Sequence, residues 1–156
     1  MTFRILRASP DHWEALRALH TLTFPGDEHE DYTDGWWWIV YDGPDPVAFA
    51  GMRLSLTEPG AIYFSRCGVL TPYRGQGLQQ KLLTARLRHV KRLGAAACIT
   101  TTIITNIPSS NNLIRAGFRL FEPPSPWGTS ETLYWRKEII ERQPNDHSGE
   151  VRAVPD

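Results

Sequence analysis

The residues best suited to chemistry lie in a short basic segment with two glycines, Arg74-Gly75-Gln76-Gly77. Before it, an apolar and β-branched stretch predicts a strand over 61–70; after it, apolar residues at helical spacing predict a long helix ending near Leu93. The first amides of a helix have no partner within the helix, and the helix dipole favours negative charge there. Glycine also lets the backbone approach a ligand closely. The segment therefore predicts an anion site that could hold a pyrophosphate.

Two familiar nucleotide-binding motifs do not fit this segment. A dinucleotide-binding Rossmann site needs a third glycine and an acidic residue about twenty residues later. The chain instead continues with Leu78-Gln79-Gln80 and has no acid nearby. A Walker P-loop needs Gly-Lys-Ser/Thr, which is absent. Both motifs are rejected.

The charges are unevenly distributed, although the formal net charge of the 156 residues is zero. Between residues 11 and 45 there are nine acids against the single base Arg17. Between residues 61 and 121 there is no acid, and the bases are Arg66, Arg74, Lys81, Arg86, Arg88, Lys91, Arg92, Arg115 and Arg119. This division predicts one half that binds anions and one that tolerates or prefers cations.

Hydrophobic periodicity, with Gly and Pro between the periodic segments, predicts the element order β-α-β-β-β-α-β-α-β-β. The strands are expected at 3–8, 36–41, 47–56, 61–70, 95–105, 118–121 and 129–139, and the helices at 10–23, 78–93 and 106–116. The predicted fold class is α/β (α+β): a single domain with a mixed, mostly antiparallel sheet and a central parallel β-α-β crossover. That domain is expected over residues 1–140. The polar residues 141–156 are expected to form a mobile tail.

The segment from Val69 to Gln79 resembles the pyrophosphate loop of the GNAT superfamily of acyl-CoA N-acyltransferases, whose hallmark is Arg/Gln-x-x-Gly-x-Gly/Ala. A second GNAT signature is an Asn at a strand end, then a short helix and Gly-Phe. Asn106 followed by Gly117-Phe118 has that spacing. The predicted element order also agrees with the family over nearly the whole chain. The chain is therefore identified as similar to GNAT acyltransferases.

This resemblance implies acetyl-CoA as co-substrate and no metal. The backbone of residues 67–69 would pair with the pantetheine arm, and the amides of residues 75–80 would hold the pyrophosphate. Asn106 would contact the cofactor near its acyl end, and the Val69 amide would polarise the thioester carbonyl. The residues implied to bind the cofactor are Cys67, Gly68, Val69, Arg74, Gly75, Gln76, Gly77, Leu78, Gln79, Gln80 and Asn106.

The chain departs from the family pattern at two positions. Gln79 stands where the loop usually has its last small residue. Leu113 stands where many members carry a Tyr that protonates the departing thiolate. A thiol, with a pKa near 8.5 by comparison with Cys, leaves with little help. An amine such as lysine, with a pKa near 10.4, is largely protonated at neutral pH, so a general base matters more than the missing acid.

For that base the sequence offers only candidates. The candidates in the acidic loop that in this family borders the acceptor are Glu28, His29, Glu30 and Asp31, although a solvated loop is the simpler interpretation. Tyr63 and Ser65 on one strand and Tyr134 on a late strand could face the acceptor, with burial as the simpler interpretation of the tyrosines. Glu28, His29 and Tyr134, with the Val69 amide as oxyanion donor, are the predicted catalytic groups.

Other reactive or aromatic residues are assigned simpler roles. The scattered histidines have no metal-ligand spacing, so surface or helix-face positions are expected for His12, His20, His89 and His147. Cys67 is interpreted as a small residue beside pantetheine rather than a nucleophile. In Trp36-Trp37-Trp38, one face is expected in the core, and the other is left open between core and a wall of the acceptor pocket.

The predicted function is transfer of an acetyl group from acetyl-CoA to an amine by direct attack in a ternary complex. The acceptor would be a small cationic amine or a protein lysine or N-terminus. The alternative is a non-catalytic acyl-CoA-binding regulatory domain, in which Leu113 reflects lost catalysis. Nucleic acid is disfavoured because phosphates would meet the acidic half. No membrane association is expected, a cytoplasmic location is expected, and a homodimer is left open.

Overall fold

The computed structural model describes residues 2–139, so the predicted tail at 141–156 lies outside the described residues. The strands are β1 (Phe3–Arg7), β2 (Trp36–Asp42), β3 (Asp45–Leu54), β4 (Ala61–Val69), β5 (Ala97–Ile103), β6 (Arg119–Leu120) and β7 (Thr132–Glu138). The α-helices are α1 (Trp13–Thr23), α2 (Leu78–Leu93) and α3 (Ile107–Arg115), and short 3₁₀ helices are η1 (Pro10–His12) and η2 (Thr71–Tyr73). The predicted element order is confirmed, and the bounds differ only at element ends.

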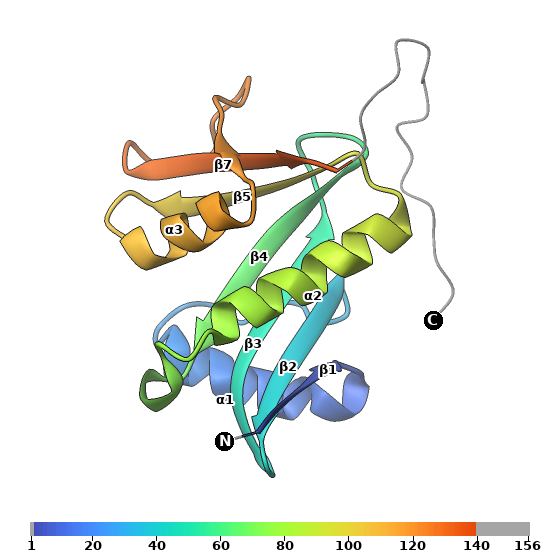
Figure 1. Cartoon of the computed structure of the whole chain (residues 1–156), viewed down its shortest axis with the longest axis vertical. Coiled ribbons are helices and arrows are strands. Elements are labelled where there is room, and N and C mark those ends of the chain that lie inside the picture. The colour runs from blue at the N-terminus through green and yellow to red at the C-terminus, as the bar shows by residue number, and fades with distance from the viewer. Residues whose placement is uncertain (1, 140–156) are drawn as a thin grey trace. The chain divides into compact units, whose positions relative to one another are not determined.

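The strands form a seven-stranded sheet in the order β1-β2-β3-β4-β5-β7-β6 (Figure 1). The pairs β1–β2, β2–β3, β5–β7 and β6–β7 are antiparallel. β4 and β5 pair in parallel, with α2 as the crossover between them. The predicted fold class, a mixed and mostly antiparallel sheet with a parallel crossover, is confirmed.

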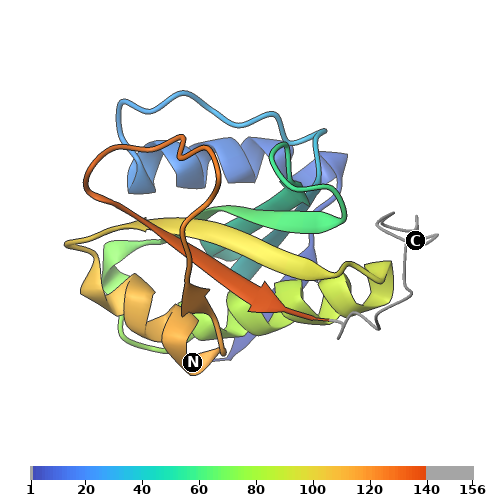
Figure 2. The ribbon, with the colours of Figure 1, turned by 90° about the horizontal axis from the view of Figure 1, so that it is seen from above.

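The described residues fall into two compact units. The first unit comprises residues 2–53 and 65–86, and the second comprises residues 54–64 and 87–139. In the first unit, α1 covers one face of the strands and the first part of α2 covers the other (Figure 2). Leu16 and Leu19 of α1 pack with Trp37, Ile39 and Phe49 of β2 and β3. These positions follow the helical and strand periods of the sequence, which is why one face of each element is buried.

Adjacent residues of a strand point to opposite faces, and both faces of β2 are covered. Trp37 and Trp38 are both buried, whereas Trp36 is partly exposed. Trp37 packs against Phe49 and meets Tyr32 edge to face. The prediction that one face of this strand packs in the core therefore holds for Trp37. Trp38 is buried as well, so its side chain is not exposed to line an acceptor pocket.

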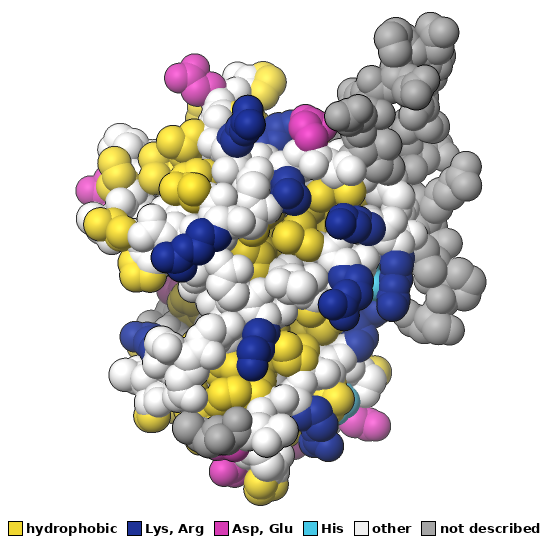
Figure 3. All heavy atoms as spheres, in the orientation of Figure 1, with side chains coloured by type: hydrophobic (Ala, Val, Ile, Leu, Met, Phe, Trp, Pro, Cys, Tyr) yellow, Lys and Arg dark blue, Asp and Glu magenta, His cyan; other side chains and the backbone are white. Residues whose placement is uncertain are grey.

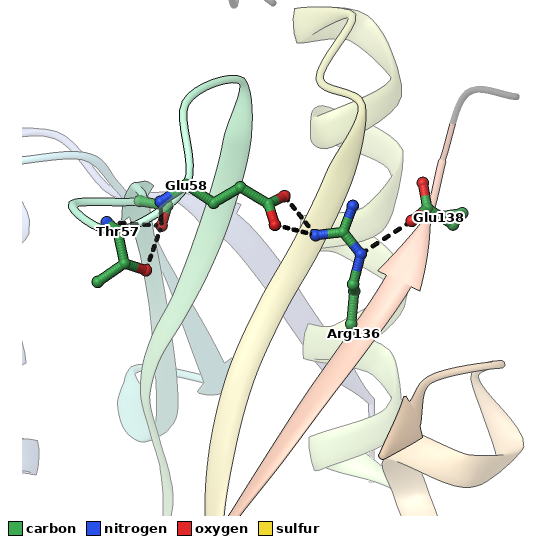
Figure 4. Close-up of polar contacts among 5 residues, drawn as sticks. Thr57, Glu58, Arg136 and Glu138 are labelled. Carbon is green, nitrogen blue, oxygen red and sulfur yellow. Dashed lines mark hydrogen bonds and ion pairs between the residues drawn. The ribbon is translucent and has the colours of Figure 1, made fainter. Parts of the chain in front are cut away.

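In the second unit, α3 packs on one face of β5 and β7 (Figure 2). Ala61, Ala97 and Ile99 form a small core, and Phe64 contacts Phe118. Arg136 of β7 lies between two carboxylates and donates to Glu58 and to Glu138 (Figure 4). Its hydrogen bonds to Glu58, followed by those to Glu138, raise the pKa of the Arg136 guanidinium. This ion pair ties the β3–β4 turn to the last strand.

Among residues 2–139, no helix is long and apolar enough to cross a bilayer.

Candidate functional site

The turn between β4 and α2 has the backbone that an anion-binding helix start requires. Gly75 and Gly77 adopt φ values of +77° and +79°, which residues with a side chain rarely adopt. An added Cβ at either glycine would meet no atom within 4 Å, so backbone conformation rather than crowding requires glycine there. α2 begins directly afterwards at Leu78. Residues 74–77 are exposed, so the turn is accessible in the first unit.

The charges around this turn favour an anion. The first turn of α2 contains no acidic residue, and Lys81 is exposed on it. Arg74 folds back on the preceding strand, since its Nε donates to the Val69 carbonyl at 3.2 Å. The charged side chains visible around α2 in Figure 3 are mostly Lys and Arg. The helix dipole and the side-chain charges therefore act in the same direction.

The strand segment predicted to pair with pantetheine is tightly packed on α1. A Cβ on Gly68 would lie 2.6 Å from Thr23 Oγ1 and 2.7 Å from a Phe49 ring carbon. Burial raises the pKa of the Cys67 thiol, and the nearby Arg86 guanidinium only partly opposes this. Because the thiolate is the nucleophilic form, this shift favours the interpretation of Cys67 as a small residue. Arg86 is itself buried and donates to the Leu82 and Gly51 carbonyls.

The loop between α1 and β2, residues 24–35, is held against β4 by Arg66. The guanidinium lies 3.0 Å from Asp27 and 3.4 Å from Glu30, and it stacks on the Phe24 ring at 4.7 Å. Two of the carboxylates expected to attract a cationic acceptor are therefore paired within the protein. Glu28 in the same loop is exposed.

His29, the other predicted loop residue, is exposed but held by α1. Its Nε2 lies 3.0 Å from Thr21 Oγ1, and its ring stacks on His20 with centroids 5.1 Å apart. The first unit thus brings His29, the loop and residues 67–80 into one compact part of the molecule. It does so through contacts that link α1 with the loop and with β4.

His20 is a residue whose importance the sequence analysis missed. It is fully buried, its ring stacks on Phe49, and its Nδ1 lies 3.5 Å from the Tyr32 hydroxyl. Its Nε2 has no hydrogen-bond partner among residues 2–139. The signal was present, because Leu16, Leu19 and His20 share one helical stripe. A histidine on that stripe faces the core.

The buried His20 should make the protein less stable in acid. Burial, Arg66 and then His29 lower the pKa of His20, while Glu30 and Asp27 partly oppose this. The unfolded chain therefore binds the proton more readily, so this contribution to stability is complete above about pH 6.5 and is lost as pH falls towards the depressed pKa. We expect urea unfolding at about pH 7.5 and about pH 5.5 to show a smaller acid loss in His20→Phe than in wild type. The partly exposed His12 supplies the control: His12→Gln should keep the wild-type loss, and an equal loss in all three proteins would contradict the assignment.

The other predicted site residues lie in the second unit. The Tyr134 hydroxyl accepts a hydrogen bond from the Gly128 amide at 2.8 Å and its ring meets Trp127 edge to face. The Tyr63 hydroxyl lies 3.2 Å from Thr101 Oγ1. Both rings are partly buried, which is less than the burial that the simpler interpretation predicted.

Two further residues of the second unit bear on the resemblance to GNAT acyltransferases: Asn106 of the second signature, and Leu113, where the chain departs from the family pattern. Asn106 caps α3, since its Oδ1 accepts from the Ser109 amide at 3.3 Å. Capping uses the side-chain oxygen of Asn106 as an acceptor, so the side-chain NH₂ can still donate hydrogen bonds to another group. Leu113 is buried in α3, so no phenol stands at the position of the usual acid. Among residues 2–139, no group of three or more His, Cys, Asp or Glu is placed to hold a metal ion.

Comparison with known proteins places this geometry in a family. The model of the acetyltransferase (GNAT) family matches residues 5–118. A search of curated proteins finds no match. Among solved structures, the ribosomal-protein-S18-alanine N-acetyltransferase of Escherichia coli is similar, with a TM-score of 0.75, 14% identity, and 94% of this chain and 99% of that chain covered.

Two further structures resemble the chain to the same degree. A Bacillus subtilis acetyltransferase in complex with CoA has a TM-score of 0.72 and 14% identity, with 89% of this chain and 100% of that chain covered. Arabidopsis thaliana Naa50, in complex with the bisubstrate analogue CoA-Ac-MVNAL, has a TM-score of 0.71 and 20% identity, with the same coverage of 89% and 100%. These likenesses confirm the fold. Because the family model spans most of the chain, the protein belongs to the GNAT acetyltransferase family.

Proposed function

We propose that the protein is an N-acetyltransferase that moves an acetyl group from acetyl-CoA to a primary amine. The observation that carries the proposal is the turn opening α2, where two glycines with positive φ precede a helix start that has no acid in its first turn. Such a turn suits a diphosphate, and it directly follows the strand segment 67–69. Membership of the GNAT acetyltransferase family and the CoA bound to the similar Bacillus subtilis protein support acetyl-CoA as the co-substrate.

The cofactor would be held mainly by backbone. Amides of residues 75–80 would donate to the pyrophosphate, and residues 67–69 would pair with the pantetheine arm as an added strand. Gly68 has no room for a side chain beside Thr23 and Phe49, which keeps this segment of β4 close to α1. The Val69 amide would donate to the thioester oxygen, and the Asn106 NH₂, left over from capping, would donate to the arm.

The reaction would be direct attack of the amine on the thioester in a ternary complex. The Naa50 neighbour was solved with an analogue that joins CoA to an acetylated peptide, which agrees with simultaneous binding of both substrates in that protein. Holding both reactants in place supplies a large share of the rate enhancement in such reactions. The missing phenol at Leu113 costs little because a thiolate leaves readily.

The acceptor class stays a proposal with two members: a small cationic amine, or a protein lysine or N-terminus. The E. coli neighbour is named for the alanine of a ribosomal protein, which favours the protein class. The acidic loop favours a cation of either class, although Arg66 pairs with two of its carboxylates. A primary amine is common to both.

A second candidate function is a non-catalytic domain that binds acyl-CoA and regulates a partner. The observation that favours it is Leu113, which replaces the usual general acid by a buried aliphatic side chain. Both candidate functions use the same cofactor site, so only a measurement of acetyl transfer to an amine can distinguish them.

The deciding experiment combines calorimetry with CoA and an acceptor screen with radiolabelled acetyl-CoA. The panel should hold polyamines, amino sugars, lysine peptides and peptides with a free N-terminus. Binding together with transfer to one class supports the enzyme and identifies its acceptor. Binding without transfer to any amine favours the regulatory domain, and absence of CoA binding overturns both.

A further inference from the structure

Two imidazoles of the first unit, one on α1 and one in the loop after it, are stacked on each other. His29 is exposed in the loop after α1, and His20 lies buried beneath it. Their ring planes are 27° apart with centroids at 5.1 Å, and His29 Nε2 lies 3.0 Å from Thr21 Oγ1. A loop histidine ordinarily samples several rotamers. Here the stacking on His20 fixes the plane of the His29 ring, and the contact with Thr21 fixes which edge of the ring faces α1.

The loop that carries His29 is also held beside the strand segment proposed to bind pantetheine. Arg66, which binds Asp27 and Glu30, directly precedes Cys67 on β4. Thr23, at the end of α1, lies so close to Gly68 that a Cβ there would come within 2.6 Å of its hydroxyl. The end of α1 and the loop after it, the two elements that carry the pair, therefore both contact β4 at or next to this segment.

Three other titratable groups near the pair, Asp27, Glu30 and Tyr32, are poor bases for a bound ammonium. Asp27 and Glu30 are paired with Arg66. Burial raises the pKa of Tyr32, so its phenol stays protonated. An imidazole titrates near neutral pH in general, which is the best match for a base that must accept a proton and release it again.

Resting on the proposed acetyl transfer, we propose that His29 is its general base and that His20 and Thr21 are positioning residues for it. In the tautomer that this role requires, His29 Nε2–H donates to the Thr21 hydroxyl, which leaves the lone pair on Nδ1. Nδ1 takes one proton from the bound ammonium, and the freed amine attacks the thioester carbon. As the C–N bond forms and the C–S bond breaks, the sulfur leaves as a thiolate. The second N–H proton of the new amide passes to solvent, and the thiolate is protonated by solvent.

His20 fits a positioning role because burying its unpaired Nε2 lowers the stability of the folded protein. An unpaired buried polar atom costs about 1–3 kcal/mol. His20 Nε2 is such an atom among the described residues. Its depressed pKa keeps the ring neutral. A neutral ring can stack on His29 after it takes a proton, whereas a charged ring would repel it.

The charges that face the pair come from two elements. Arg66 of β4 opposes protonation of His20, while Asp27 and Glu30 of the loop favour it. Arg66 pairs with both carboxylates, so the three groups together keep one net negative charge beside the pair. Burial opposes a proton on His20, so we assign the proton transfer to the exposed ring of His29.

The test measures kcat/KM for the best acceptor, at saturating acetyl-CoA, from about pH 5.5 to about pH 9. His29→Gln should lower kcat/KM by about 100-fold or more and remove the rise with pH that the base produces. The KM for acetyl-CoA should stay unchanged. Free imidazole should restore part of the activity of His29→Ala and add nothing to wild type.

The positioning residues are tested separately. Thr21→Val should lower kcat/KM about tenfold with a shifted pH profile, and Thr21→Ser should restore it. His20→Phe should lower kcat/KM while raising the urea midpoint, because the unpaired nitrogen is gone. A merely structural His20 would lower both. Should His20→Phe not fold, the exposed Thr21 carries the same test.

The outcomes separate this inference from the proposed function. His12→Gln removes an imidazole that contacts Ser9 and should behave as wild type. An active wild type whose pH profile survives His29→Gln overturns the inference alone. If the wild-type protein binds CoA but transfers acetyl to no amine, both the assignment of His29 as base and the proposed enzymatic function are wrong. If it does not bind CoA, the proposed cofactor site is wrong as well.

Discussion

Gly77→Glu should weaken coenzyme A binding by about 100-fold or more, which corresponds to roughly 3 kcal/mol. Two effects add. The new carboxylate would lie at the start of α2, where it would occupy the amides and repel the diphosphate. The positive φ of +79° would also strain any residue with a side chain. Isothermal titration calorimetry with CoA measures the change directly.

A matched control separates the site from backbone strain. Gly94, at the other end of α2, also has a positive φ of +70° and no atom within 4 Å of an added Cβ. Gly94→Glu should therefore carry a similar strain and the same charge but keep the wild-type affinity. Gly77→Ala, which adds strain without charge, should fall between them. Equal affinities for Gly77→Glu and wild type, or equal losses at both glycines, would argue against the cofactor site.

Gly51→Ala should lower the free energy of unfolding by about 2 kcal/mol, since overpacked cores lose about 1–3 kcal/mol. An added Cβ would lie 2.5–2.7 Å from three atoms of the Trp37 ring. That ring cannot move freely, because Tyr32 and Phe49 pack against it and its Nε1 donates to the Asp34 carbonyl. The melting temperature should fall by roughly 4–8 °C. Urea unfolding followed by fluorescence measures the free energy.

A double-mutant cycle tests whether Trp37 causes this loss. Trp37→Phe alone should destabilise by leaving a cavity. In Gly51→Ala/Trp37→Phe, the smaller ring should accommodate the new methyl group, so the double variant should lose clearly less than the sum of the single losses. Simple additivity would place the strain elsewhere.

The element order and the glycine turn before α2 could be predicted from the sequence because both depend on local chemistry. Strand and helix periods follow from backbone geometry within each segment. Gly75 and Gly77 indicate a turn that only glycine adopts easily, and the helix after them exposes its amides whatever else the chain does. Element ends were less certain, as with the last strand, predicted over 129–139 and observed as Thr132–Glu138. End residues are held by turns and caps rather than by a periodic face.

The roles of individual polar side chains depended on distant partners. Asn106 is a helix cap as well as a motif residue. Arg66 is one of nine bases in an acid-free segment of the sequence. Nothing nearby in sequence indicates that it pairs with Asp27 and Glu30 in the loop after α1. Pairing of this kind changes how much negative charge the loop presents to an acceptor.

The sequence by itself determined the fold class, the order of the elements and the glycine turn, because each follows from patterns within a few neighbouring residues. The predicted acyltransferase activity came from the resemblance of that turn to the GNAT pyrophosphate loop. Only the tertiary structure decided that His20 is buried under His29, that Trp38 is covered, and that the loop is clamped to β4. Burial and ion pairing depend on which surfaces meet, and residues far apart in the chain supply those surfaces.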